Sequence, residues 1–132
     1  VRFHPRMTNS EKEELTTLWQ ENGILGRLNI KEANEEPLPL VLLECFVHIS
    51  AFSGCILEAA SMNIMSIITS EIGVDMCHEL VLSNQAIPCI SSNSNELTNI
   101  LKNQYNKTFG VNRETKITDY KKTIDELDAI FD

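Results

Sequence analysis

The sequence predicts a mainly α-helical protein with a few short strands. Segments in which Ser, Thr or Asn stands three residues before Glu recur ahead of apolar runs, and this spacing is typical of capped helix N-termini. Apolar residues then follow at helical spacing. Gly and Pro, which mark turns and the ends of helices and strands, number only five and four in 132 residues. The length and the apolar fraction of 42% indicate one domain with a core of its own.

The first helix is predicted from two overlapping capping boxes, which begin at Thr8 and Ser10. Its apolar face consists of Leu15, Leu18 and Trp19, and Gly23 ends it. We expect residues 1–8 to form a flexible arm and residues 24–30 a short strand or an extended link. Residues 31–39 are polar and contain Pro, so they are the expected internal hinge.

The middle of the chain is predicted from its apolar runs. Residues 40–52 are apolar nearly all round, which indicates a buried helix. Residues 55–72 form either one helix or an extended piece at 55–59 followed by a helix at 62–72, and Gly73 ends the run in both cases. Asp75 caps a further helix that continues to about Asn84. Residues 86–90 are a short extended piece around Pro88.

The C-terminal part contains two amphipathic helices in this interpretation. The first follows a capping box at residues 93–96, and its apolar face consists of Leu97, Ile100, Leu101 and Tyr105. Residues 111–117 are a candidate strand. The last helix covers about residues 118–131, and its apolar stripe consists of Tyr120, Ile124, Leu127 and Phe131.

A family resemblance refines the fold prediction. The segments Leu40-Val41-Leu42-Leu43-Glu44 and Ala60-Ser61-Met62-Asn63-Ile64-Met65-Ser66-Ile67-Ile68 resemble the winged-helix domain at the end of origin-recognition-complex largest-subunit proteins and their heterochromatin-silencing relatives. The resemblance implies a winged-helix-like core with extra helices, a chromatin association and a nuclear rather than cytoplasmic location. Residues 74–80 are acidic at the place where a DNA-reading helix needs basic residues. The resemblance therefore implies a domain that contacts proteins and not DNA. The competing fold is a five- to six-helix bundle.

The distribution of charge excludes several functions for the middle segment. No Lys or Arg occurs between Lys31 and Lys102, while nine carboxylates do: Glu32, Glu35, Glu36, Glu44, Glu58, Glu71, Asp75, Glu79 and Glu96. Binding to nucleic acid or to an anionic membrane requires bases that this segment lacks. The longest uncharged apolar stretch, residues 45–57, is also too short to span a membrane.

DNA binding by the flanks is the first alternative function. It would use the basic residues on either side of the middle segment: Arg2, Arg6, Lys12, Arg27, Lys31, Lys102, Lys107, Arg113, Lys116, Lys121 and Lys122. Each group is balanced by nearby acids, so direct nucleic-acid binding is not the preferred interpretation.

The second alternative is a small cysteine-dependent enzyme, with Cys45 or Cys89 as the reactive thiol. Cys45 and His48 lie one turn apart in the predicted helix, but their surroundings are apolar and acidic, whereas a reactive thiolate needs positive charge nearby. The four cysteines lack the spacing of a zinc site or a redox motif. We therefore predict no catalytic residue, no metal and no cofactor, and reduced thiols in an intracellular compartment.

The preferred function is a non-enzymatic module for protein–protein interaction or self-association. The chain starts without Met, which indicates a domain excised from a larger intracellular protein. Its expected partners are a second copy, giving a homodimer, another protein, or both, and no membrane. The predicted interface consists of apolar residues from three segments: Leu15, Leu18, Trp19, Ile64, Met65, Ile68, Tyr120, Ile124, Leu127 and Phe131.

Overall fold

The computed structural model describes residues 1–91 and 94–108. The chain consists of two compact units, Val1–Val41 and Leu42–Asp132. The described residues are mainly helical and contain three short strands, so the predicted fold class is confirmed at this level. The strand predicted at 111–117 and the helix predicted at 118–131 lie outside the described residues.

The first unit contains α1 (Asn9–Glu21), the 3-10 turn η1 (Leu25–Arg27) and α2 (Lys31–Glu35). The predicted capping box is confirmed, because Thr8 accepts from the Glu11 amide while the Glu11 carboxylate accepts from the Thr8 amide. These hydrogen bonds to Thr8 lower the pKa of Glu11 below its ordinary value. Gly23 follows the helix with a φ of +67°, a conformation that favours glycine and ends α1 as expected.

Residues 1–3, at the start of the segment expected to form a flexible arm, are bonded to α2 and to the residues beside it. The Arg2 guanidinium donates to the carbonyls of Ala33 and Glu36, at 2.9 and 2.7 Å. The amide of Phe3 donates to the side chain of Asn34. The Phe3 ring also stacks on Trp19 of α1, with 6.0 Å between the ring centroids. The segment that was expected to be a hinge therefore provides the helix that holds the N-terminus.

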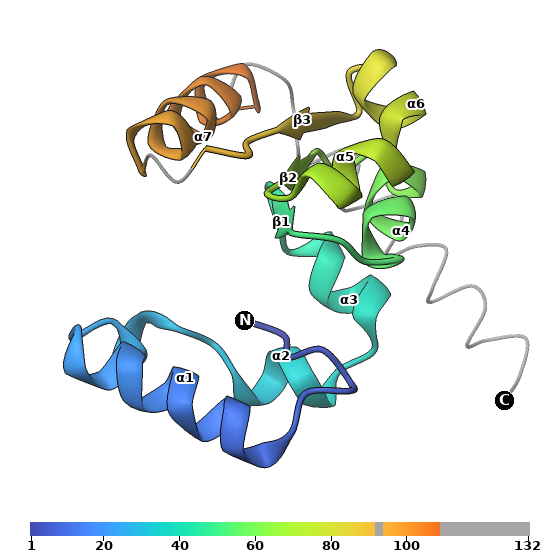
Figure 1. The fold of residues 1–132 in the computed structure, drawn as a ribbon. Coiled ribbons are helices and arrows are strands. Elements are labelled where there is room, and N and C mark those ends of the chain that lie inside the picture. The colour runs from blue at the N-terminus through green and yellow to red at the C-terminus, as the bar shows by residue number, and fades with distance from the viewer. Residues whose placement is uncertain (92–93, 109–132) are drawn as a thin grey trace, which may run out of the picture. The chain divides into compact units, whose positions relative to one another are not determined.

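The second unit is built around a three-stranded parallel sheet in the order β1-β2-β3. The strands are β1 (His48–Ser50), β2 (Ser66–Ile68) and β3 (Ala86–Pro88). Ile49 pairs with Ile67, and Ile67 pairs with Ile87. Between the strands run α4 (Cys55–Ser61), then α5 (Glu71–Met76) and α6 (His78–Leu82), and α7 (Ser94–Thr108) follows β3. Figure 1 shows α4, α5 and α6 on one side of the strands and α7 on the other.

The core of this unit lies between β2 and the α4–α6 layer. Ile68 and Ile56 are fully buried there, together with Cys77 and Ala86, and Val74, Leu80 and Val81 pack against them. Ile67 points to the opposite face of the sheet because neighbouring strand residues alternate, and it is also fully buried. The central strand is thus covered on both faces, as parallel strands usually are.

The connections from α4 to β2 and from α6 to β3 share one turn geometry. Asn63 after α4 and Asn84 after α6 have φ values of 57° and 58°. The next amide reaches back in each case, from Ile64 to the Ala59 carbonyl and from Gln85 to the Leu80 carbonyl, both at 2.8 Å. This is the Schellman pattern, in which Asn replaces the more common Gly. It turns the chain sharply enough for a strand to begin two or three residues later.

Residues 38–73 differ most from the sequence prediction. The helix predicted at 40–52 is a short helix, α3 (Leu38–Leu43), followed by β1. The piece predicted as extended at 55–59 is helical, and the helix predicted at 62–72 contains β2. Gly73 does not end a helix but lies buried inside α5, whose cap is Ser70 rather than Asp75. Residues 24–30 contain η1 in place of the predicted strand or link.

The winged-helix order expected for residues 40–90 is accordingly not confirmed, since a parallel βαβ arrangement occupies them. Two other predictions are confirmed. Residues 86–88 are extended as β3, and the residues predicted as an amphipathic helix after position 93 form α7.

Candidate functional site

The carboxyl ends of the three strands form the candidate site. We call residues 51–54, 69–70 and 89–91, which follow β1, β2 and β3, the carboxyl edge. In open parallel α/β sheets, ligands bind outside the carboxyl ends of the strands, because the loops there converge from neighbouring strands. The order β1-β2-β3 contains no reversal of strand order, so this edge is a candidate by its position at the carboxyl ends and not by a crevice at a switch point.

A serine joins the first two loops of the carboxyl edge. The Ser70 hydroxyl donates to the Ala51 carbonyl at 2.7 Å and accepts from the Gly73 amide at 3.1 Å. The strand ladder continues beside it, because the Thr69 amide donates to the Ser50 carbonyl at 3.0 Å. Ser70 therefore caps α5 and also fixes the loop that leaves β1.

Gly73 lets α5 approach that loop. A Cβ at this position would collide with the Ala51 carbonyl oxygen and lie 2.7 Å from a methyl group of Ile68. Such contacts leave no room for a side chain, so only glycine fits here. Because the colliding oxygen belongs to the backbone, the geometry of the carboxyl edge depends on this residue.

The groups exposed at the carboxyl edge are aromatic, aliphatic and hydroxyl-bearing, and a carboxylate follows it in α5. Phe52, in the loop after β1, has 55% of its surface exposed, and Ile90 is exposed after β3. Thr69 is exposed and Ser53 is partly buried. The nearest charge in sequence is the Glu71 carboxylate at the start of α5, which is also exposed. No base is available from residues 32–101, so the edge has no cation of its own from this segment.

At the other end of the sheet, the partly buried His48 pairs with the buried Ser66. The His48 Nδ1 lies 3.1 Å from the Ser66 hydroxyl, and the two residues are partners in the β1–β2 register. Burial lowers the pKa of His48 below its ordinary value, which keeps the imidazole neutral near pH 7. Ser66 is fully buried and cannot reach a substrate, so this pair joins two strands rather than forming a nucleophilic site.

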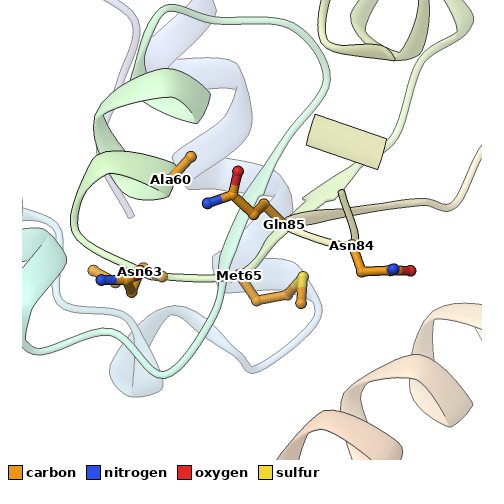
Figure 2. A pocket seen from close by; sticks show the side chains of 6 residues that line it. Ala60, Asn63, Met65, Asn84 and Gln85 are labelled. Atoms are coloured by element: carbon orange, nitrogen blue, oxygen red, sulfur yellow. The ribbon is translucent and has the colours of Figure 1, made fainter. Parts of the chain in front are cut away.

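A shallow cavity of about 150 Å³ also lies at the amino end of the sheet. Figure 2 shows that its side chains come from the end of α4 and from the two connections that lead into β2 and β3. It is lined by Ala60, Asn63, Ile64, Met65, Asn84 and Gln85. These residues are mostly turn residues with structural roles, and ligands in this architecture bind at the opposite end. The cavity is therefore not our candidate site.

The four cysteines are free. Cys77 and Cys89 are buried, whereas Cys45 and Cys55 are partly buried. Cys45 precedes β1, so the helical-turn spacing to His48 on which the enzyme alternative rested is not present. Within residues 1–91 and 94–108, no three His, Cys, Asp or Glu side chains gather to hold a metal ion.

The predicted interface residues are distributed over separate places. Leu15, Leu18 and Trp19 lie on α1, which has no fully buried residue, and Leu18 is about half exposed. Ile64 and Met65 are brought together beside the amino-end cavity. Ile68 is fully buried in the core of its own unit, so its side chain is not exposed to a partner in this structure, and the predicted interface stays a prediction. The remaining four, Tyr120, Ile124, Leu127 and Phe131, lie outside the described residues.

Two of the basic residues assigned to the DNA-binding alternative have structural contacts. Arg2 is bonded to α2, and the Lys12 ammonium lies over the Phe3 ring at 5.9 Å from its centroid. Arg6 and Arg27 are exposed. Binding of nucleic acid by the flanks stays a prediction.

The residues that shape the carboxyl edge, Phe52, Ser70 and Gly73, were absent from the predicted site residues, and Gly73 was expected only to end a helix. One signal was present, because Ile67-Ile68-Thr69 is a run of three β-branched residues followed by Ser-Glu, which is typical of a strand leading into a capped helix. The helical spacing of Ile64, Ile67 and Ile68 competes with that signal and predicts a helix instead.

Comparisons with known proteins add no family to this description. No family model, curated protein or solved structure shows a significant match to the chain. None of the helices among the described residues has the length and apolar character needed to cross a membrane.

Proposed function

We propose that the second unit binds a small, uncharged, hydroxyl-rich ligand at its carboxyl edge. The observation that carries this proposal is the parallel direction of the three strands, which brings three loops together at the carboxyl ends, the end at which parallel α/β sheets bind ligands. The bond from Ser70 to Ala51 and the close approach of Gly73 support it, since they fix two neighbouring loops in advance of binding.

The chemistry of the edge indicates the ligand class. An exposed aromatic ring at Phe52 offers a flat apolar surface, and the Glu71 carboxylate and the Thr69 hydroxyl offer hydrogen bonds to hydroxyl groups. A polyanion would meet carboxylates without compensating bases from residues 32–101. Sugar-like molecules, which combine hydroxyl groups with an apolar face, satisfy these conditions.

Amide chemical shifts, recorded while a panel of neutral monosaccharides is added to the full chain, test this proposal. The expected shifts cluster at residues 51–54 and 69–71, and Phe52→Ala abolishes them. Leu82→Ala is the matched control, because Leu82 is also highly exposed but lies at the end of α6, away from this edge. Shifts confined to the amino-end cavity, or no shifts with any sugar, would contradict the proposal.

A second candidate function is the non-enzymatic protein association expected from the sequence. The four most exposed large apolar side chains among the described residues, Leu57, Ile72, Met76 and Leu82, all lie on α4–α6 and are 59–75% exposed. Burying such side chains contributes about 1.5–3 kcal/mol each. Sedimentation of Ile72→Gln, Met76→Gln beside the unmodified chain tests this function. Unchanged association would exclude this surface as the interface.

A further inference from the structure

The two edges of the sheet are not equivalent. In a strand, the N–H and C=O of one residue point to one side and those of the next residue point to the other. His48 donates to the Met65 carbonyl at 2.9 Å, and Ser50 accepts from the Thr69 amide at 3.0 Å. Both residues of β1 therefore face β2, and the backbone groups of Ile49 point to the outer edge.

The outer edge of β3, in contrast, cannot pair fully with another strand. Gln85 accepts from the Ser66 amide at 3.3 Å, and Cys89 donates to the Ile68 carbonyl at 2.8 Å. These two residues and Ile87 face β2, which leaves Ala86 and Pro88 pointing outwards. Proline has no N–H to donate, and proteins use it to prevent the pairing of edge strands. Further pairing is thus disfavoured at β3 and open at β1.

The outer edge of β1 is exposed and uncharged. Ile49 is 46% exposed, and among the described residues no hydrogen bond reaches its N–H or C=O from the outer side. No charged side chain occurs between Glu44 and Glu58. A chain with a net charge of −8 would otherwise repel its own copy, so the absence of carboxylates here matters.

We propose that β1 pairs with β1 of a second copy of this chain, antiparallel and about a two-fold axis centred on Ile49. The outward backbone groups of Ile49 then match their own symmetry mates, so that Ile49 exchanges both backbone bonds with the partner's Ile49. Because Pro88 blocks the other edge, association stops at two copies instead of continuing as a fibre. The pairing uses Ile49 and not the loop of residues 51–54, where Ser70 holds the Ala51 carbonyl, so the ligand proposal does not depend on it.

Sedimentation across a wide concentration range tests the pairing. The full chain is expected to form a dimer and nothing larger. Ile49→Pro removes the outward N–H without touching the bonds to β2, and it should weaken the dimer at least about tenfold. Ile49→Val is the matched control, because it keeps the N–H and the β-branched shape, and it should leave the dimer intact. Pro88→Val restores a donor at the second edge and should produce species larger than a dimer.

Cross-linking provides a test that does not require the Pro variant to fold. In a hydrogen-bonded antiparallel pair the two Cα atoms are about 5.5 Å apart, within disulfide range. Ile49→Cys should therefore form a bridge between the two introduced thiols on oxidation, and peptide mass spectrometry distinguishes it from bridges to native cysteines. A chain that stays monomeric, a dimer unaffected by Ile49→Pro in a folded variant, or pairing only with a strand of a different protein would overturn the proposal.

Discussion

Replacing Gly73 by alanine should destabilise the second unit strongly. The new methyl group would collide with the Ala51 carbonyl oxygen, so either the loop after β1 or the start of α5 must move. Overpacking of this kind costs about 1–3 kcal/mol. The movement also breaks the 2.7 Å bond from Ser70 to Ala51, worth about 1 kcal/mol, so the expected loss is about 2–4 kcal/mol.

The matched control is Gly54→Ala, because a Cβ at Gly54 meets nothing within 4 Å and the backbone there is already helical. Alanine at this site should be neutral or slightly stabilising. Urea unfolding followed by circular dichroism measures both variants. In a double-mutant cycle, Ser70→Ala should cost less in the Gly73→Ala background than in the unmodified chain, because both substitutions act through the Ala51 carbonyl. A Gly73→Ala variant as stable as the Gly54→Ala control would refute this reasoning.

Three further predictions concern other parts of the chain. Asn63→Gly and Asn84→Gly should raise the melting temperature, whereas alanine at either site should cost about 1–2 kcal/mol, because each φ is left-handed. Burial holds the pKa of His48 below its ordinary value of 6.5, so the unfolded chain binds the proton first and stability should fall as the pH drops from 6.5 through the folded pKa. Urea midpoints between pH 7.5 and 5.5 measure this slope, which His48→Gln should remove. Phe3→Leu should shift the fluorescence of Trp19, the only tryptophan, and destabilise the first unit by about 0.5–1.5 kcal/mol; an unchanged spectrum would contradict the ring stacking.

Local signals predicted the ends of the described chain well. The capping box at Thr8 and the glycine at position 23 fix α1 by contacts within a few residues, so no tertiary information is needed to find them. The same holds for α7, which has a regular apolar stripe, and for the extended piece around Pro88.

The middle of the chain was harder because buried parallel strands and buried helices have similar sequences. Residues 40–52 are almost continuously apolar, which fits both a buried helix and a strand covered on two faces. Three-residue strands such as β2 are also too short to show alternation. The pairing of Ile49, Ile67 and Ile87 is a long-range property, and the hydrophobic spacing within 55–72 pointed to a helix instead.

The candidate site depends on the same long-range pairing. Phe52, Ser70 and the residues after β3 come from three loops that are neighbours only because the strands are parallel and in the order β1-β2-β3. Composition alone still showed that none of these loops carries a basic side chain, because residues 32–101 contain no Lys or Arg. The close contact of Gly73 with Ala51 had no sequence signal beyond a glycine between two helical segments.

The most direct test of this account is the direction of the strands in solution, measured by nuclear Overhauser contacts in the labelled full chain. The parallel register predicts contacts between amide and Hα protons from residues 66–68 to residues 48–50 on one side and 86–88 on the other. Strong Hα–Hα contacts between residues 66–68 and 86–88 are found only where antiparallel strands approach closely. Their presence would contradict the parallel sheet and, with it, the carboxyl edge on which the proposed function rests.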